Sequence, residues 1–358
     1  MNYRQVKIHA AETLGASGTK IIPINVKDPI TRITIQGYVT VGVAPRLAPI
    51  VDALTKVEIV DGSDVIYELS GSEIVAASFY EGHKHISFHE WNIPSVASEF
   101  CVDLYFGRFI GDPLLAFDPT KFSNPMLRIT WDCTKPSAAA AVIILEVDAY
   151  CFDEKIISPI GLLRTTQHQS YTGGVSTYEY VDLPTDLPIR KLYLQTKQYG
   201  VAVASVFEGA KLSEDNDKRV VFDMDAHDWK FKMSHEFGYC SQNWWAYPTG
   251  VGLGEWFPAP AEDMMVVGVT TMDMVAFMIN ETRGCRALAL SADVTALLQG
   301  HAKGTIPYWV WCFPFGLQQE IDDWYDVTRV GSLRLRVKSG TVGTSTTYNT
   351  ILQQLRRY

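Results

Sequence analysis

The sequence lacks the features that mark several common classes of protein. Its six cysteines are scattered without a Cys-x-x-Cys pair, which argues against a zinc ribbon and a dense disulfide framework. No apolar run approaches the roughly 18 residues of a transmembrane helix, and residues 1–7 lack the apolar core of a signal peptide. We therefore expect a chain made in the cytosol, with reduced cysteines in its core.

Basic charge is also scarce. The chain of 358 residues has 31 lysines and arginines against 40 aspartates and glutamates, which gives a net charge of −9. This balance argues against a protein that condenses nucleic acid on its own surface. Hydrophobic residues make up 47% and charged residues 20% of the chain, so a disordered protein is excluded and a folded core is expected.

Catalytic signatures are missing from the sequence. There is no Gly-x-Ser-x-Gly and no His-Glu-x-x-His motif, and residues 300–305 lack the residue order of a phosphate-binding loop. We therefore predict no catalytic residues, no cofactor and no enzymatic activity.

What the sequence does contain is a succession of short strand patterns. The 17 prolines and 26 glycines divide the chain into apolar runs rich in valine, isoleucine, threonine and tyrosine. Residues 127–132 and 333–338 alternate apolar and polar side chains, as in a sheet with one face in solvent. In the first half the predicted strands are 19–26, 30–42, 55–60, 64–69, 84–91, 100–107, 126–132 and 141–151.

A few short helices are predicted between the strands. One covers 72–80 with Ser72 as its N-cap, and another begins at Asp112, where Pro113 would take the first helical position. The counterpart of the second helix is residues 317–324. The acidic run 223–228 could hold a divalent cation, but it matches no known ligand spacing, and a strand end followed by a helix with Asp225 as its N-cap is the favoured interpretation. The last predicted helix, 292–299, would end at Gly300.

The chain repeats itself once. Residues 28–36 recur as 187–195, and residues 65–69 recur as 220–224. The second copy carries a long insert, 249–304, that the first copy lacks. The sequence thus predicts an all-β protein of two tandem eight-stranded antiparallel jelly rolls, a double jelly roll with short helices. The expected parts are an N-terminal arm (1–18), a first jelly roll (19–152), a linker (153–174) and a second jelly roll (175–358).

This order of elements resembles the double jelly-roll major capsid proteins. That family forms the shells of tailless icosahedral viruses of DNA genome, many with an internal membrane. The resemblance rests on four features: the two tandem units with the helix at 72–80, a second helix before the strand 126–132 with its equivalent before 332–338, the N-terminal segment before the first strand, and the long insert in the second unit. It implies a structural protein of the virion that is assembled in the host cytoplasm, and a pseudo-hexagonal homotrimer that tiles the capsid.

The resemblance also implies partners. These are neighbouring trimers, penton or minor capsid proteins and internal membrane lipid, without sequence-specific binding of nucleic acid. Positive charge at both chain ends could meet lipid head groups or neighbouring trimers, or could simply be solvated; the residues are Arg4, Lys7, Arg356 and Arg357. The insert is too apolar to extend freely into water, so we expect it to contact a neighbouring subunit of the trimer through Trp256, Phe257, Met264 and Met265.

Histidines at alternate positions form a weak candidate metal site. His83, His85 and His89 would share one face of a strand, and histidines at i and i+2 can share a metal ion. A polar strand face with solvated histidines accounts for the same pattern.

A carbohydrate-active enzyme or glycan-binding protein, secreted or cytosolic, with two β-sandwich domains is the main alternative. It would need a carboxylate pair or an aromatic cleft, and the aromatic runs 243–245 and 309–311 keep this possibility open. The alternative for Trp309 and Trp311 is an inward-facing strand. A cytosolic bicupin is a further alternative, but the run 83–89 does not reproduce the metal-ligand spacing of cupins.

Overall fold

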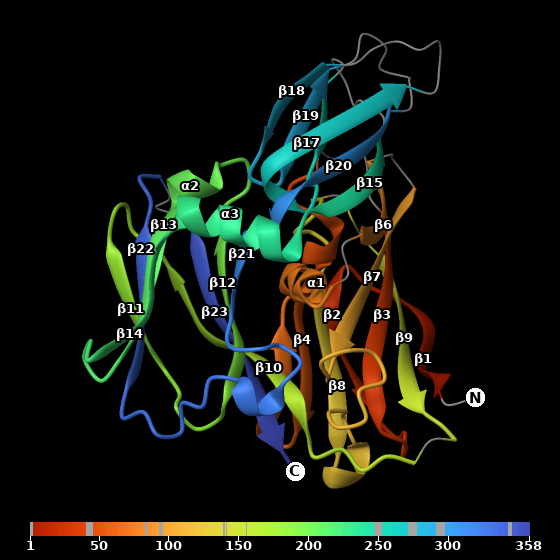
Figure 1. Ribbon diagram of the computed structural model, residues 1–358. Helices are drawn as coiled ribbons and strands as arrows, with labels where there is room; N and C mark the ends of the chain where they lie inside the picture. The colour runs from red at the N-terminus through yellow and green to blue at the C-terminus, as the bar shows by residue number, and fades with distance from the viewer. Residues whose placement is uncertain are drawn as a thin grey trace.

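The structure of the protein is a computed structural model that describes residues 3–40, 46–82, 85–92, 96–138, 140, 142–154, 156–246, 253–270, 278–290, 298–342 and 346–358. Two units lie side by side with their strands nearly upright, and the insert rises above them at one end (Figure 1). Both chain termini lie toward the opposite end. None of the described helices is long and apolar enough to cross a membrane.

The first unit is a sandwich of two four-stranded antiparallel sheets, ordered β1-β9-β3-β7 and β2-β8-β4-β5. Apart from the β4–β5 hairpin, each successive strand of the unit changes sheet, and this is the path of a jelly roll. The strands are β1 (Tyr3–Leu14), β2 (Ser17–Pro23), β3 (Ile30–Thr40), β4 (Leu54–Asp61), β5 (Asp64–Leu69), β7 (Ala97–Tyr105), β8 (Pro125–Asp132) and β9 (Val142–Phe152).

The second unit repeats this path, with sheets ordered β10-β23-β12-β21 and β11-β22-β13-β14. Its strands are β10 (Gly161–Thr172), β11 (Tyr178–Leu183), β12 (Ile189–Lys197), β13 (Phe207–Glu214), β14 (Arg219–Asp225), β21 (Val310–Pro314), β22 (Leu333–Ser339) and β23 (Thr347–Arg357). The predicted double jelly roll is thus confirmed.

The repeat seen in the sequence extends to strand register. The block 28–36 and its copy 187–195 lie on β3 and β12, and both strands carry a β-bulge at the same point, after Ile30 and after Ile189. The block 65–69 and its copy 220–224 lie on β5 and β14. Residues of the two units can therefore be matched one by one.

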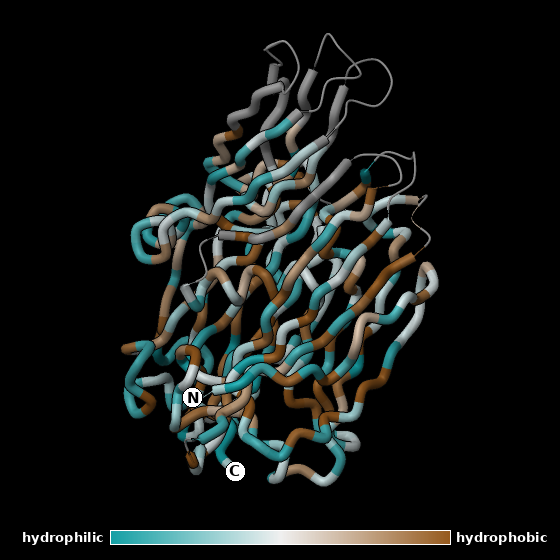
Figure 2. Tube along the Cα trace, turned by 90° about the vertical axis from the view of Figure 1, so that its right-hand side faces the viewer, coloured by the Kyte–Doolittle hydropathy of each residue, from teal (hydrophilic) through white to brown (hydrophobic). Residues whose placement is uncertain are grey.

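Alternation along the strands builds the core. Leu127, Ile129 and Trp131 of β8 point inward and are buried, while the residues between them are partly exposed. Figure 2 shows hydrophobic and hydrophilic residues alternating along many strands of the sandwich. One continuous apolar cluster runs through both units, so the two jelly rolls share a single interior.

Helices α1 (Gly71–Tyr80) and α3 (Ala226–Phe237) follow β5 and β14 at equivalent places. Ser70, not Ser72, is the N-cap of α1, and it forms a capping box with Glu73. Asp225 is the N-cap of α3, as predicted, and its carboxylate accepts a hydrogen bond from the His227 amide at 2.8 Å. A third helix, α2 (Val203–Val206), is a single turn.

The two other predicted helices on described residues are wrong. The Asp112 carboxylate accepts hydrogen bonds from Arg108 and from the Leu114 amide, which holds residues 107–118 in an irregular loop. Residues 317–324 contain only the 3₁₀ turn η3 (Ile321–Asp323), and two further such turns are η1 (Ile50–Ala53) and η2 (Pro119–Lys121). Gly300 lies inside a strand and ends no helix, and residues 291–297 fall outside the described residues.

Two predicted boundaries also need correction. The expected arm 1–18 contains β1, which pairs with β9 along its whole length and is a full member of the first jelly roll. The sequence of β1 shows no clear alternation, because its residues are partly or fully exposed. One edge of β1 has no strand beside it among the described residues. The expected linker 153–174 contains β10, so the connection between the units is 153–160.

The insert of the second unit extends a sheet of the first. β6 (His85–Asn92) continues the β7 edge, and it pairs in parallel with β15 (Cys240–Ala246). β20 (Leu298–Pro307) and β17 (Pro260–Thr270) complete this eight-stranded sheet. β16 (Leu253–Trp256), β19 (Arg286–Leu290) and β18 (Met278–Arg283) form a separate small sheet, and β18 lies beside β17 (Figure 1).

Candidate assembly surfaces

The junction between the two units is held by strand pairing and by polar side chains. β5 of the first unit pairs in parallel with β10 of the second, at Thr165–Tyr67 and Thr166–Glu68. This pairing joins one sheet of each unit into a single eight-stranded sheet. Two arginines fasten the same edge: Arg164 Nε donates to the Val65 carbonyl at 3.0 Å, and Arg356 forms an ion pair with Asp64.

A buried cluster of charges lies at the top of this junction. The Glu81 carboxylate, which follows α1, accepts hydrogen bonds from Arg190 Nη1 and Lys191 Nζ, each at 2.7 Å. The Gln353 amide donates to the same oxygen at 3.2 Å, and Lys191 also donates to the Tyr80 carbonyl at 2.9 Å. Because all three charged side chains are more than nine-tenths buried, each depends on the others for its partners.

The cluster shifts the titration of its members. Burial raises the pKa of Glu81, but the positive charges of Lys191 and Arg190 and their hydrogen bonds outweigh this effect, so the pKa lies below its usual range. Burial lowers the pKa of Lys191, against the opposing attraction of Glu81. The carboxylate is therefore charged at neutral pH and holds the two units together.

Sequence reasoning missed this cluster, although one signal was present. Arg190 and Lys191 lie near the start of β12, directly between Ile189 and the apolar residues Leu192, Tyr193 and Leu194. Two adjacent cations beside such an apolar run are stable in the interior only if they find polar or charged partners there. Their partner Glu81 is more than 100 residues away, and the sequence offers nothing that connects it to them.

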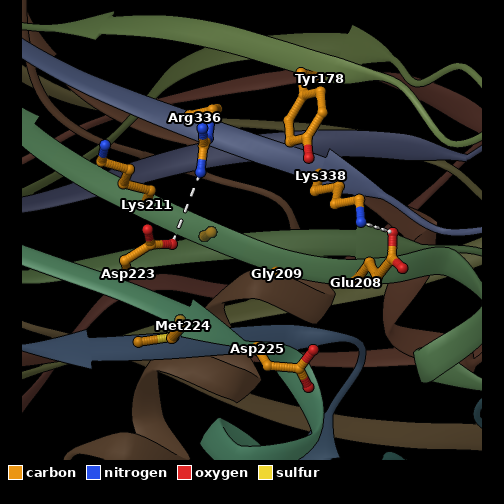
Figure 3. A pocket seen from close by; sticks show the side chains of 10 residues that line it. Tyr178, Glu208, Gly209, Lys211, Asp223, Met224, Asp225, Arg336 and Lys338 are labelled. Atoms are coloured by element: carbon orange, nitrogen blue, oxygen red, sulfur yellow. Dashed lines mark ion pairs between the residues drawn. The ribbon is translucent and has the colours of Figure 1, made fainter.

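The outer face of the sheet β11-β22-β13-β14 carries a shallow charged pocket. Its volume is about 260 Å³, and Tyr178, Lys211, Asp223, Arg336 and Lys338 are among the residues that line it (Figure 3). The carboxylates here are engaged: Lys338 pairs with Glu208 at 2.8 Å, and Arg336 pairs with Asp223 at 3.8 Å. The third carboxylate of the lining belongs to Asp225, the N-cap of α3.

Three of the four tryptophans in the aromatic runs that kept a glycan-binding role open are buried, and Trp245 is partly exposed. Trp244, Trp309 and Trp311 are each at most 1% exposed, so their rings cannot serve as platforms for a sugar. Trp311 lies on β21 and points inward, as the alternative expected.

The histidine candidates do not form a described metal site. His83 lies outside the described residues, and His85 and His89 lie on β6. Within the described parts of the chain, no three histidine, cysteine, aspartate or glutamate side chains converge as metal ligands. All six cysteines are free; five are buried as expected, but Cys101 is exposed.

The basic residues near the termini are bound within the chain. Arg4 pairs with Asp28 at 2.5 Å and with Asp153 at 3.2 Å, and Lys7 pairs with Glu146. Arg356 pairs with Asp64, while Arg357 is exposed. A groove of about 580 Å³ lies beside β1, and Arg4, Lys7, Val26 and Lys27 contribute to its lining.

The insert residues expected at a subunit contact divide into two groups. Trp256 and Phe257 are buried inside the chain, and Trp256 stacks on Trp244 with ring centroids 3.9 Å apart. They are therefore not presented to a neighbour, which corrects the prediction for these two residues. Met264 is partly buried against the same cluster, and Met265 is 58% exposed. Contact of Met264 and Met265 with another subunit stays a prediction.

Two complete jelly rolls in one chain, fused through a shared sheet and with an insert rising from the second, define the double jelly-roll fold of viral major capsid proteins. The chain is similar over 99% of its length to three solved structures of that fold. For the major capsid protein of Sulfolobus turreted icosahedral virus the TM-score is 0.62, with 9% identity and 96% of that chain covered. For the VP54 protein of PBCV-1 the values are 0.59, 12% and 94%.

The major capsid protein of bacteriophage PM2 is the third, with a TM-score of 0.56, 8% identity and 98% of that chain covered. No protein-family model matches the chain, and no curated protein matches it in sequence. At these identities the similarity establishes the fold, and the function is proposed below.

Proposed function

We propose that the chain is a viral major capsid protein, with a structural role in the virion and no catalytic role. The observation that carries this proposal is the match of both jelly rolls, their fusion and the insert, over 99% of the chain, to major capsid proteins. A partial match to one sandwich would be compatible with many functions, because β-sandwiches serve many roles. A whole-chain match to a duplicated unit is far more restrictive.

The assembling species is a homotrimer. Each chain contributes two similar upright units, so three chains place six similar units around one axis and form a pseudo-hexagonal block. Such a block can tile an icosahedral shell through near-sixfold contacts. Its further partners are neighbouring trimers, penton or minor capsid proteins at the vertices, and internal membrane lipid beneath the end that carries the termini. Arg357 is exposed at that end and is available for such contacts.

The first experiment measures the native mass of the purified chain by light scattering, followed by negative-stain imaging of the same peak. The expected result is a mass of three times the 40.0 kDa chain and particles of hexagonal outline. A chain that remains monomeric at high concentration and under capsid-forming conditions contradicts the proposal, most clearly if it also binds glycans.

A second experiment removes residues 250–303. If the insert packs against its copy in a neighbouring subunit through Met264 and Met265, the shortened chain forms a trimer of lower stability. A shortened chain with unchanged trimer stability contradicts that contact and leaves the capsid role intact.

A further inference from the structure

The first strand of each jelly roll has a different neighbour. β10 is flanked by β23 on one side and by β5 of the first unit on the other. β1, the equivalent strand of the first unit, has β9 on one side and is the edge of its sheet. β14, the equivalent of β5, is likewise the edge of its sheet. Within the described parts of the chain there is therefore one filled junction and the two halves of an empty one.

Strand register assigns the residues of the empty junction. Bulge and pairing positions match Cys151 to Gln354 across β9 and β23, and thus Arg4 to Arg164 across β1 and β10. The N-caps Ser70 and Asp225 match α1 to α3 and β5 to β14. These matches predict what would meet if a second copy filled the junction.

Arg4 occupies the place of Arg164. Within the chain Arg164 donates to the Val65 carbonyl, and the residue equivalent to Val65 is Val220. Val220 is exposed, as is Arg4 at 43% of its side chain. Arg4 of one copy can therefore donate to the Val220 carbonyl of a second.

Arg32 and Glu236 occupy the places of Lys191 and Glu81. The positive and negative charges are conserved, but Glu236 is exposed on α3 where Glu81 is buried. Within the chain Arg32 pairs with Asp103 through Nη1 at 3.3 Å, and its side chain is 26% exposed. Tyr150 takes the place of Gln353, so its hydroxyl group can also reach Glu236.

Asp153 and Arg219 occupy the places of Arg356 and Asp64, with the charges exchanged. Within the chain the second unit supplies the arginine and the first unit the aspartate of this ion pair. In the empty junction the first unit supplies Asp153 and the second unit Arg219, which are 36% and 65% exposed. Both junctions pair an aspartate with an arginine, but the two residue types have exchanged positions. Duplication alone would have kept each type at its original position, so the exchange indicates that the two surfaces are complementary.

We propose that the partner of the β1 edge is a second copy of this chain, which places β14 and α3 beside β1 as β5 and α1 lie beside β10. The interface contains the pairs Arg4–Val220, Arg32–Glu236 and Asp153–Arg219, each between one copy and the next. This inference rests on the proposed capsid trimer and specifies its contact. One like-charged pair, Glu146 with Asp228, falls in the same interface, and Lys7 beside Glu146 offsets it.

Cross-linking tests the contact directly. In a Cys101→Ser background, Asp153→Cys and Arg219→Cys are combined and treated with a short bismaleimide. The expected product on a denaturing gel is a covalent series that ends at three chains. Asp64→Cys with Arg356→Cys is the control for an in-chain junction and yields no product above one chain. The control for random collision combines Asp153→Cys with Tyr180→Cys. Tyr180 is exposed on β11, at the opposite edge of the sheet from the strand β14 that carries Arg219.

Charge exchange provides a second, independent test. Arg219→Asp or Asp153→Arg alone places like charges in the interface, and we expect trimer association about tenfold weaker by sedimentation. The double variant restores an opposite pair and brings association back to near the wild-type value. Circular dichroism checks that each exposed substitution leaves the fold intact.

The outcomes separate the two proposals. The proposed interface is wrong if trimers form without the 153–219 cross-link and if neither charge variant changes their association. The capsid proposal stands in that case. A wild-type chain that stays monomeric in every condition overturns both.

Discussion

Arg4 and Arg164 hold the same register position on the first strands of the two jelly rolls, yet among the described residues only the strand of Arg164 has a neighbour on both sides. Arg164 Nε donates to the Val65 carbonyl across the junction at 3.0 Å, whereas Arg4 turns to Asp28 and Asp153 of its own unit. The same duplicated position is thus part of a filled contact in one unit and of an open one in the other. This asymmetry is the basis of several expected results.

Replacing Glu81 with glutamine strongly destabilises the chain. The substitution leaves Arg190 and Lys191 buried without a countercharge, which costs about 3–5 kcal/mol of unfolding free energy. Chemical denaturation at dilutions where the chain is monomeric measures the loss. The matched control is Glu236→Gln, the exposed equivalent in the second unit, which changes unfolding by no more than about 0.5 kcal/mol. If the two variants lowered the unfolding free energy equally, the buried Glu81 would contribute no more to stability than the exposed Glu236.

The same carboxylate gives the fold a specific acid sensitivity. Because the folded pKa of Glu81 lies below its usual value of 4.5, its stabilising contribution is present above about pH 4.5. The contribution is lost as the pH falls through the lowered pKa. Unfolding free energy measured from pH 6 downward therefore decreases more steeply in the wild type than in Glu81→Gln. Parallel pH profiles for the two proteins would contradict this assignment.

Cys101 is the thiol that reacts first in the native chain. It is the exposed member of six free cysteines. Partial burial, together with the negative charge of Asp103, raises the pKa of Cys101 to about 11. Labelling by a maleimide is therefore slow at pH 7 and accelerates toward pH 9. One equivalent reacts in the native protein and six react in denaturant. Cys101→Ser removes the native reaction, and its persistence in that variant would refute the assignment.

Stacking of Trp256 on Trp244 anchors the insert to the sheet below it. Trp256→Ala removes a buried indole and destabilises the insert locally by about 3–5 kcal/mol. Limited proteolysis then cuts within 253–307 faster than in the wild type, while the two jelly rolls stay intact. Met265→Ala, at an exposed position of the same insert, leaves the cleavage rate unchanged. Cleavage that begins in the jelly rolls instead would place the weak point elsewhere.

The sequence allowed prediction of those elements whose burial has a simple period. β8 alternates cleanly because one face meets the core and the other faces outward, so its bounds were predicted closely. β1 was missed because an edge strand with partly exposed residues on both faces shows no clear period. The helix expected at Asp112 failed because the Asp112 carboxylate binds Arg108, four residues earlier. Arg108 also donates to the Gln319 carbonyl, a distant partner that local rules cannot anticipate.

The candidate assembly surfaces were beyond sequence reasoning for a related reason. The sequence shows the repeat of 28–36 at 187–195. Which surface can bind a second copy, however, depends on which sheet edges already have a neighbouring strand. That information lies in the pairing of β5 with β10, which joins residues about 100 positions apart. The insert residues were chosen for their apolar character, and this same character buries Trp256 and Phe257 inside the chain.

If copies associate through the proposed interface, the exchanged charges of the two junctions determine the order of the units around a ring. Asp64 and Asp153 lie on opposite sides of the first unit, and Arg219 and Arg356 on opposite sides of the second. Two first units side by side would bring Asp64 against Asp153, and two second units would bring Arg219 against Arg356. Both arrangements are repulsive, so only strict alternation satisfies every junction. A closed ring then always contains whole chains and an even number of units.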